Sequence, residues 1–547
     1  MSGRSDRFDV VIAGSGFAGS ILARLLARAG RRVLLVERAS HPRFAVGESS
    51  TPLAAIALER LAARYDLPDL ASLAAYGRWS RDLAGPGRSL KRGLKRGFTF
   101  LAHRPGQALA PDASGRWRLL VAASPDDRVA DSHWLRADVD AHLAGRAAAE
   151  GVEVRERTEL AVEELGAGAC RLQASPERGE PYEVRASFLV DATGAAGLVA
   201  KAVGRPQAAP RLDSALLFSH FDRVAPLDVL GPLGPEGPYP DERAAVHHLL
   251  EEGWMYALRF DDGRVSAGIE LLGAAAREAR AALGGAGAAD REEALRRIVR
   301  RYPTLAAQYG EARALRPVAF VPRLQRRLAR AAGPSWLLLP HAFAFSTPLF
   351  STGIAWSLLG VERAARLLEA GEAPEAASLE RYSRLLALEA GWVERLAAGA
   401  FAAMSAAEPG DLGAFGPWSL LYFAAASWSE ARQRLLPEER ADSGAWCWEP
   451  FLGAGDPGLE EIVVQAEERL RQILAGGAPR AFDAWVRSAI PPRDVAGLGR
   501  GDRGGLYPVD LEDLVAAHDV LGLTEDEVRR ALPRLRGAAA EPEEVGR

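Results

Sequence analysis

Residues 8–37 read FDVVIAGSGFAGSILARLLARAGRRVLLVE, and this stretch decides the fold of the chain. An apolar run of strand length leads into a G-x-G-x-x-G turn, a helical pattern follows, and a second apolar run ends on Glu37. In such a βαβ unit Gly14 permits the tight turn, Gly16 lets the backbone approach a pyrophosphate, and Gly19 lets the helix pack closely on the strand. A carboxylate at the end of the second strand accepts from a ribose hydroxyl. Because strand, helix and terminal acid all accompany the glycines, we predict a dinucleotide-binding fold.

Length and composition narrow the class further. A single core stops growing at roughly 250 to 300 residues, so a chain of 547 residues is expected to hold two or three domains. The two cysteines, Cys170 and Cys447, are far apart without metal-ligand spacing, which favours a reduced cytoplasm. A net charge of -4 with acids and bases interspersed predicts no nucleic-acid or membrane partner. The apolar stretch from Val10 is interrupted by glycines, Arg24 and Arg28, so we expect neither a signal peptide nor a membrane span.

The order of the patterns predicts an α/β fold. A second strand-like run ends on Asp191-Ala192-Thr193-Gly194, a small-residue turn that again suits close approach to a cofactor. Alternating runs within 206–329 predict an antiparallel sheet on the substrate side, inserted into the nucleotide fold, with a helical stretch over 274–300. Residues 1–7 are expected to be a loose tail. The expected domains are a discontinuous Rossmann-like domain (1–80, 132–205 and 330–372), a substrate-side sheet domain (81–131 and 206–329) and a helical C-terminal region (373–547).

A polar loop over 41–52 follows the nucleotide-binding unit. Its Arg43 and its Gly47-Glu48-Ser49 lie where they can reach phosphate groups and the edge of a cofactor. The alternative is a solvated loop in which Ser50 or Thr51 caps the next helix. Spacing alone leaves both interpretations open.

A basic cluster precedes a predicted strand at Phe98-Thr99-Phe100-Leu101. Such a run of charge is usually a solvated face, and composition alone favours that interpretation. A lysine just ahead of a buried strand can instead be held inside a pocket, where its proton is available to a reacting oxygen. The cluster consists of Arg88, Lys91, Arg92, Lys95 and Arg96.

A second loop, FSTPLFSTGI over 345–354, precedes a helix predicted over 356–370. The exposed N–H groups at the start of that helix make an anion or carbonyl site. An ordinary loop with a Ser or Thr cap is the alternative.

Taken in this order, the segments over residues 8–370 resemble the flavin-dependent halogenases, the tryptophan halogenase-like branch of the FAD monooxygenase superfamily. The glycine turn, Gly47-Glu48-Ser49, Arg136 with Asp140, and Asp191-Ala192-Thr193-Gly194 are shared with the wider superfamily. Three further segments resemble the halogenases more specifically. KRGFTF over 95–100 looks like the segment with the active-site lysine, GWMY over 253–256 resembles half of a Gly-Trp-x-Trp-x-Ile-Pro motif, and 345–353 is similar to the halide-side loop.

The resemblance implies FAD as the cofactor, supplied in its reduced form by a separate flavin reductase, with O2 and chloride or bromide as co-substrates. In the family, hypohalous acid travels through a tunnel to the lysine beside an aromatic substrate. By this resemblance Lys95 holds and activates the hypohalous acid and Ser351 lines the passage. Thr352 and Gly353 bind the halide, and Trp254, Phe100 and Phe350 line the substrate pocket. The implied FAD contacts are Gly14, Gly16, Phe17, Ala18, Gly19, Glu37, Arg43, Gly47, Glu48, Ser49, Arg136, Asp191, Gly194 and Ile354.

Three departures from the family pattern qualify this prediction. Pro340-His341-Ala342 replaces the superfamily's Gly-Asp-Ala, which implies weaker FAD binding. Ala257-Leu258-Arg259 lacks the second Trp and the Ile-Pro of the motif thought to block direct oxygenation, so hydroxylation stays open. Phe350 replaces a glutamate of the tryptophan-specific branch, which favours a phenolic or pyrrolic ring over free tryptophan.

We therefore predict an FADH2-dependent halogenase of electron-rich aromatics of the phenol, pyrrole or indole type, either free or tethered to a carrier protein. Two alternatives stay open. One is an FAD-dependent monooxygenase or oxidoreductase without halogenating activity. The other is a non-catalytic binding protein on an eroded flavoprotein scaffold.

Overall fold

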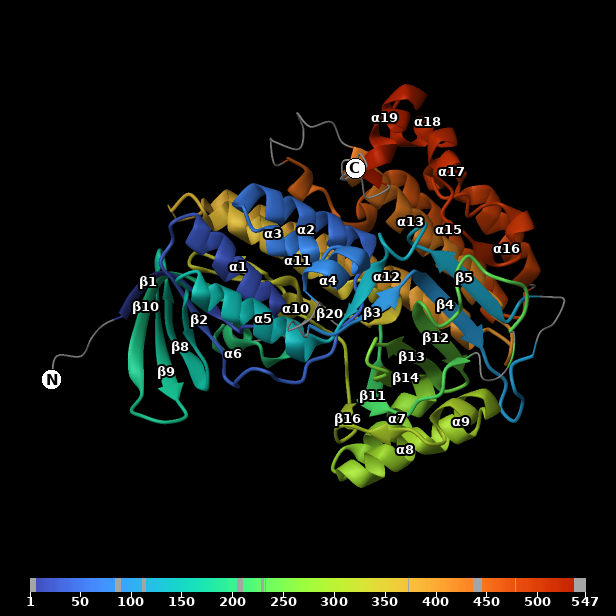
Figure 1. The fold of residues 1–547 in the computed structure, drawn as a ribbon, viewed down its shortest axis with the longest axis horizontal. Helices are drawn as coiled ribbons and strands as arrows, with labels where there is room; N and C mark the ends of the chain where they lie inside the picture. Colours follow the sequence, from blue (N-terminus) through green and yellow to red (C-terminus); the bar gives the residue numbers. More distant parts are fainter. Residues whose placement is uncertain are drawn as a thin grey trace, which may run out of the picture.

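A computed structural model describes residues 6–83, 90–110, 115–203, 210–227, 231, 233–371, 373–435, 445–477 and 479–535. Arg88 of the predicted basic cluster lies outside the described residues. Two large sheets and the helices that cover them make up the molecule (Figure 1).

The N-terminal βαβ unit is confirmed. β1 pairs in parallel with both β10 and β2, and α1 (Phe17–Arg28) connects β1 to β2. All four residues of β2 are buried, as expected for a parallel sheet covered on both faces. The first sheet therefore has the Rossmann-like core that the sequence predicts. Its main path is β18 (Ala332–Gly333), β19 (Trp336–Leu338), β10 (Tyr182–Asp191), β1 (Asp6–Ala13), β2 (Val33–Val36) and β7 (Glu153–Arg155).

Two details of this sheet correct the sequence predictions. Asp6 and Arg7 belong to β1, opposite Val184 and Arg185, so the tail is shorter than predicted. The strand-like run that ends on Asp191 begins at Tyr182 and forms the single long strand β10. β10 is continuous because β1 pairs with it from Val184 to Asp191. β9 (Ala169–Pro176) pairs with the first half of β10, and β8 (Thr158–Gly166) pairs with β9.

Helices cover the first sheet, and one of them links it to the predicted halide-side loop. α11 (Gly353–Leu368) packs against α1 and against α2 (Pro52–Tyr65), and α1 packs against α5 (Arg136–Ala149). The apolar side chains that predicted helix α1 are all buried. Short helices fill the connections: α3 (Pro68–Ser72), α4 (Tyr76–Asp82), α6 (Leu198–Ala202) and α10 (Pro340–Phe343).

The second sheet carries the residues of the substrate side. Most neighbours are antiparallel, as predicted, but β12 pairs in parallel with β4 and β5 pairs in parallel with β21. Because β12 and β4 are neighbours, the segments 81–131 and 206–329 share one sheet. Its order is β15 (Arg313–Ala314), β11 (Ser214–Asp222), β14 (Val265–Leu272), β13 (Gly253–Arg259), β12 (Ala245–Leu250), β4 (Gly97–Ala102), β5 (Arg118–Ala122) and β21 (Leu506–Tyr507), with β16 (Ala319–Val321) beside β11.

The two faces of this sheet have different covers. α7 (Gly273–Leu283), α8 (Ala288–Arg300) and α9 (Pro303–Tyr309) bury one face, where Met255 and Ile269 belong to a separate apolar cluster. The sequence predicts one helical stretch over 274–300, whereas the structure has two helices separated by a glycine-containing turn. The opposite face points toward the nucleotide-binding core.

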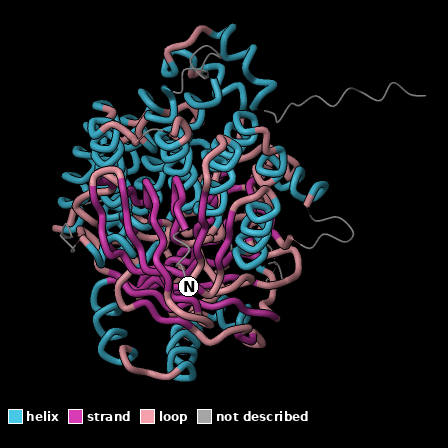
Figure 2. The backbone as a smooth tube through the Cα atoms, turned by 90° about the vertical axis from the view of Figure 1, so that its left-hand side faces the viewer, coloured by secondary structure: helices cyan, strands magenta, loops and turns pink. Residues whose placement is uncertain are grey.

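The C-terminal region is mainly helical, as predicted, and β21 is the strand that joins it to the second sheet. Figure 2 shows the strands as a central layer with helices above and below in that view. In the described part of the chain no helix has both the length and the hydropathy needed to cross a membrane. The helices are α12 (Ala376–Ser405), α13 (Phe415–Leu435), α15 (Pro457–Leu474), α16 (Pro479–Ala489), α17 (Leu511–Ala516), α18 (His518–Leu521) and α19 (Glu525–Leu535).

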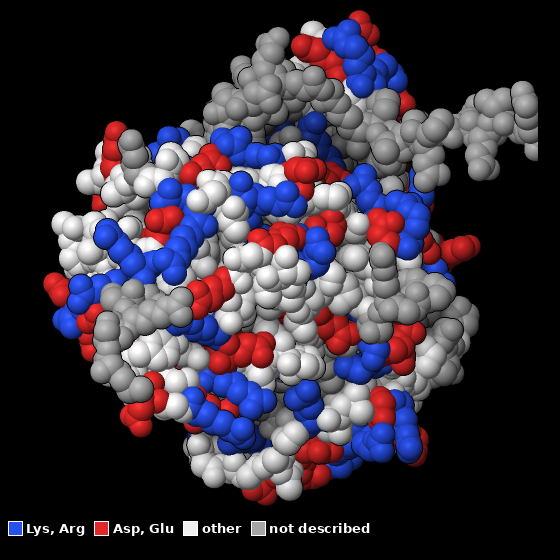
Figure 3. All heavy atoms as spheres, turned by 60° about the vertical axis from the view of Figure 1, so that its left-hand side comes forward, with Lys and Arg blue, Asp and Glu red and all other residues white. Residues whose placement is uncertain are grey.

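Three described tryptophans of this region lie in its core. Trp392, Trp418 and Trp428 are buried, while Trp448 and Trp485 are partly buried. On the face drawn in Figure 3, acidic and basic side chains are interspersed.

Candidate active site

The glycine turn is built for close approach. Gly14 has φ +99°, and a Cβ atom there would lie 2.7 Å from the carbonyl oxygen of Ala192. A Cβ on Gly19 would lie 2.0 Å from the carbonyl oxygen of Gly14. A side chain at either position would therefore collide with backbone.

Two guanidinium groups face the turn at Gly16. A Cβ on Gly16 would lie 3.5 Å from an Nη2 atom of Arg136 and of Arg43. Asp140 orients Arg136 through two hydrogen bonds of 2.9 Å and also accepts the N–H of Phe17 at 3.1 Å. A helix N-terminus flanked by two cations is suited to a pyrophosphate.

Glu37 ends β2 as predicted and is buried. The N–H and hydroxyl of Ser15 donate to Oε2 of Glu37, and the N–H of Ala39 donates to Oε1. Burial raises the pKa of Glu37, but the Arg43 guanidinium and these hydrogen bonds outweigh burial, so the pKa is lowered overall. The carboxylate is thus ionised at neutral pH and can accept from a ribose hydroxyl.

These features fit FAD on the geometry of the chain itself. A turn without side chains, a helix N-terminus, two guanidinium groups and a terminal carboxylate lie in the order that a dinucleotide needs. Ala18 and Gly19 begin α1 behind this turn. Asp191 bonds its own turn, accepting from Thr193 N at 2.9 Å and from Val199 N at 2.8 Å.

The 47–51 loop is tied to the strand that carries Lys95. Ser50 donates its N–H to the carbonyl oxygen of Ser132 at 3.1 Å, and its hydroxyl accepts from Ser132 N at 3.2 Å. Ser132 lies on β6 (Asp131–Trp134), which pairs with β3 (Arg92–Lys95). Ser49, Ser50 and Thr51 are buried, and no side-chain cap is formed at α2, so the alternative of a solvated, capping loop is wrong.

Glu48 and Gly47 connect this loop to two further elements, β11 and α5. Nε2 of His220 on β11 lies 3.1 Å from both carboxylate oxygens of Glu48. Arg136 donates to the carbonyl oxygens of Val46 and Gly47. The loop therefore connects the second sheet to α5 and to the β3–β6 pair.

Lys95 differs in burial from the other described cations of its basic cluster. Lys91 is exposed and forms an ion pair with Asp262, so a solvated face describes it correctly. Arg92 and Arg96 form ion pairs with Asp261 and Asp127, but their side chains are only 14% and 13% exposed, so a solvated face does not describe them. Lys95 is 0% exposed, because side chains alternate along β3 and Gly93 and Lys95 both point inward.

The ammonium group of Lys95 has few partners. Nζ donates to the carbonyl oxygen of Ser50 at 2.6 Å and lies 4.0 Å from the ring centroid of Phe98. Burial lowers the pKa of Lys95, and the carboxyl group of Asp131 opposes that change. Burial also lowers the pKa of His133 and of His247 to about 3, so both imidazoles beside Lys95 are neutral.

An aromatic wall extends from Lys95 along the inner face of the second sheet. The ring of His247 lies 4.8 Å from that of Phe100 and 5.1 Å from that of Trp254. Phe350 approaches Phe100 at 6.1 Å. Trp254, Phe100 and Phe350, the predicted pocket residues, therefore belong to one wall with His247 and Phe98.

The sequence prediction missed the contribution of α13 to this wall. Tyr422 stacks on Phe350 with centroids 4.1 Å apart and donates its hydroxyl to the Phe350 carbonyl oxygen at 3.3 Å. Phe415 and Phe423 contact Phe100. No local motif marks these residues, since α13 is aromatic and apolar along most of its length.

The 345–354 loop has an unusual backbone. Phe350 and Ser351 have φ +64° and +56°, a region that costs residues other than glycine about 1–3 kcal/mol. Thr352 is the N-cap of α11 without a side-chain cap, so the alternative of a Ser or Thr cap is wrong. The first N–H groups of a helix lack partners within the helix, so Gly353 and the buried Ile354 present backbone donors there.

His341 stands where the superfamily has an acid. A Cβ on Gly353 would lie 2.9 Å from the imidazole, so the ring contacts the start of α11. Burial lowers the pKa of His341 to about 3. The ring is therefore neutral and adds no charge to the site.

Glu270 is a buried acid that the sequence prediction passed over. It lies on β14 opposite Trp254 and accepts from Ser214 Oγ at 2.5 Å and from Thr347 Oγ1 at 2.6 Å. Burial raises its pKa to about 7. No local signal marks Glu270, because it shares the polar positions of an alternating run with Ser266 and Gly268, although the folded strand is buried on both faces. Glu270 thus connects the sheet to the 345–354 loop.

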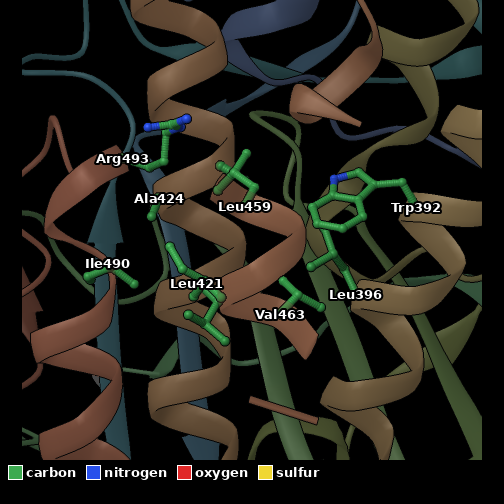
Figure 4. A pocket seen from close by; sticks show the side chains of 10 residues that line it. Trp392, Leu396, Leu421, Ala424, Leu459, Val463, Ile490 and Arg493 are labelled. Carbon is green, nitrogen blue, oxygen red and sulfur yellow. The ribbon is translucent and has the colours of Figure 1, made fainter. Parts of the chain in front are cut away.

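A separate hollow lies among the C-terminal helices (Figure 4). It is a small hollow between α12, α13 and α15, with Trp392, Leu421 and Leu459 among its lining residues. Arg493 at this hollow is held by Asp456 at 2.9 Å. None of the predicted site residues lines it.

The fold and the glycine turn define a flavin-type dinucleotide-binding protein. A family model described as FAD dependent oxidoreductase matches residues 9–355. The chain belongs to this family of FAD-dependent oxidoreductases. That assignment agrees with the predicted FAD-type fingerprint.

Comparisons with individual proteins give more specific similarities than the family model does. The chain is 29% identical over 411 residues to the tetracycline 7-halogenase of Kitasatospora aureofaciens, covering 73% of this chain and 70% of the relative. It is 29% identical over 375 residues to the monodechloroaminopyrrolnitrin halogenase PrnC of Pseudomonas fluorescens, covering 67% of this chain but only 62% of PrnC. The fold is similar to the crystal structure of halogenase PltM in complex with phloroglucinol and FAD, with a TM-score of 0.77, 22% identity and coverage of 90% and 98%. The predicted resemblance to flavin-dependent halogenases is confirmed.

Proposed function

We propose that this protein is an FADH2-dependent halogenase that installs chlorine or bromine on an electron-rich aromatic ring. The observation that carries the proposal is the buried Lys95, whose ammonium group lies between the 47–51 loop and the aromatic wall. Two relatives named halogenases support the reaction class. Within the described ranges Lys95 has no ion-pair partner within 4 Å, and a buried cation of this kind is unusual and is a functional candidate.

In this proposal the cofactor, the start of α11 and Lys95 have separate roles. Bound reduced FAD, with O2 and halide, supplies the oxidising chemistry that yields hypohalous acid. Backbone N–H groups of Thr352 and Gly353 hold the halide at the start of α11, and Ser351 lines the passage. Lys95 has three N–H donors, and the only hydrogen bond it makes to a described residue is the one to Ser50, which leaves two donors to bind and polarise the hypohalous acid.

The substrate is proposed to lie against the aromatic wall. Trp254, Phe100 and Phe350 offer ring surfaces and exclude water, which keeps the oxidant from hydrolysis. With Phe350 in place of a carboxylate, a phenol or pyrrole that sheds its own proton suits the site best. An indole, or a ring tethered to a carrier protein, belongs to the same proposal, as does a separate flavin reductase.

The proposed domain division has the substrate-side sheet facing the FAD-binding segments across this wall. Residues 1–80, 132–205 and 330–372 would bind FAD. The 373–547 region would close the pocket through α13, whose Tyr422, Phe415 and Phe423 contact the wall.

The test is a product assay. We expect protein, FADH2, O2 and chloride or bromide to convert a panel of phenols, pyrroles and indoles to products with the halogen isotope pattern in mass spectra. The matched control omits halide. Oxygenated product formed without halide would instead support the second candidate, a monooxygenase.

One observation favours that second candidate. Arg259 stands where the resembling motif continues, and its guanidinium is held by Glu242 and by the carbonyl oxygen of Val224. Tyr256 stands at the second Trp of the motif and Arg259 at its Pro, so this half of the motif lacks both of these residues. Halide dependence of product formation decides between the two.

A further inference from the structure

Asp131 lies opposite the predicted catalytic lysine. In the antiparallel pair of β3 and β6, Lys95 and Asp131 are register partners. Side chains of directly opposed residues point to the same side of a sheet, with Cβ atoms about 4.5–5.5 Å apart. Both side chains are buried, and Asp131 is only 3% exposed.

The carboxyl group of Asp131 lacks the partners that a buried acid normally has. Among the described residues, its Oδ2 atom has no hydrogen-bond partner. A buried acid of this kind is destabilising unless an opposite charge compensates it. The charge placed to do so is the ammonium group across the strand pair.

The other ionisable groups around the pair do not replace either member. His133 on β6 and His247 on β12 face Lys95 as neutral rings. Glu430 and Arg434 on α13 act on Asp131 with opposite signs and pair with each other at 3.0 Å. Asp131 is the group whose charge raises the pKa of Lys95 against the effect of burial, and Lys95 correspondingly lowers the pKa of Asp131.

We propose that Asp131 is a positioning residue that keeps Lys95 in its ammonium form inside the dry site. A lone lysine at full burial loses its proton and with it the donor that polarises an oxidant. The choice of hypohalous acid as the acceptor rests on the proposed function. The charge coupling between Lys95 and Asp131 does not depend on the proposed function.

The first test is the pH profile of kcat/KM for halogenation. In Asp131→Asn we expect the alkaline limb to move down by at least one pH unit, because Lys95 deprotonates earlier. Asp131→Glu keeps the charge and should retain the limb within half a unit. Asp127→Asn is the matched control, since Asp127 is partly exposed and pairs with Arg96 and Arg243. An unshifted limb in Asp131→Asn would overturn the proposal.

The second test needs no catalytic activity. Denaturant unfolding of wild type, Asp131→Asn, Lys95→Met and the double variant at pH 7 measures the coupling between the two side chains. We expect at least a tenfold coupling in the unfolding equilibrium constant, or about 1.4 kcal/mol. Additive effects would show that the pair does not interact. Coupling without any halogenated product would leave Asp131 as the partner of Lys95 and reject the proposed reaction.

If Asp131→Asn does not fold, Lys95→Met gives the same information from the other side. Without the ammonium group the carboxyl of Asp131 stays protonated to higher pH in the folded state. The free energy of unfolding of Lys95→Met should therefore fall relative to wild type as pH rises from 6 to 9. Identical pH slopes would contradict the coupling.

Discussion

Glu270 shows how one buried acid connects two elements of the site. Its carboxyl group accepts from Ser214 on β11 and from Thr347 on the 345–354 loop. The hydroxyl of Thr347 also accepts from Leu349 N at 3.1 Å. The loop that precedes α11 is thus fastened to the sheet through Glu270.

Replacing Thr347 tests that fastening. Thr347→Val removes the hydroxyl and leaves a buried acid with one fewer donor, which costs about 1–3 kcal/mol. We expect the KM for halide to rise about tenfold while the Kd for FAD stays the same, because the halide site and not the FAD turn is displaced. Thr347→Ser retains the hydroxyl and should behave as wild type. An unchanged KM for halide in Thr347→Val would show that the hydrogen bond between Thr347 and Glu270 does not position the loop.

Glu270 also predicts a pH dependence of stability. Its pKa rises on folding from 4.5 to about 7, so between these values the folded state binds more protons than the unfolded state, and stability falls as pH rises. Glu270→Gln lacks this penalty. Its free energy of unfolding should therefore improve relative to wild type, by up to about 3 kcal/mol between pH 4.5 and pH 7. Denaturant titrations at several pH values measure the difference, and parallel curves would show that Glu270 titrates normally.

At the scale of elements, the glycine turn joins β1 and α1. Gly19→Ala would place a Cβ atom 2.0 Å from the Gly14 carbonyl oxygen, so α1 must move away from the strand. We expect a loss of FAD affinity of more than tenfold and a lower melting temperature, measured by flavin fluorescence titration and thermal unfolding. Gly145→Ala in α5 is the control: a Cβ there meets nothing within 4 Å, and helix propensity predicts a gain of about 0.5–1 kcal/mol. Unchanged FAD affinity in Gly19→Ala would contradict the role of the turn.

The elements also show what sequence patterns convey. The strands β1 and β2 and the helix α1 follow from local periodicity and glycine placement, whereas α11 begins at Gly353, ahead of the predicted start at Trp356. β12, whose six residues are all buried, gives no alternation and was missed. Its parallel pairing with β4 joins segments about 150 positions apart, and no local pattern encodes such a pairing.

On the scale of the whole molecule, the site is assembled from distant segments. Lys95 was identified by resemblance, and its burial follows from the alternation of β3, yet Asp131, Glu270 and Tyr422 come from other elements that only the folded chain brings near. The sequence can predict residue types in a motif. It cannot predict which side chains a sheet and α13 place around them, because these contacts depend on long-range packing.

Product analysis of Lys95→Met tests the central claim most directly, with FAD binding measured in parallel and Lys91→Met as the exposed control that pairs with Asp262. We expect Lys95→Met to bind FAD with the affinity of wild type and to lose halogenated product by at least a hundredfold, while Lys91→Met retains it. Halogenation at the wild-type rate in Lys95→Met would contradict the account.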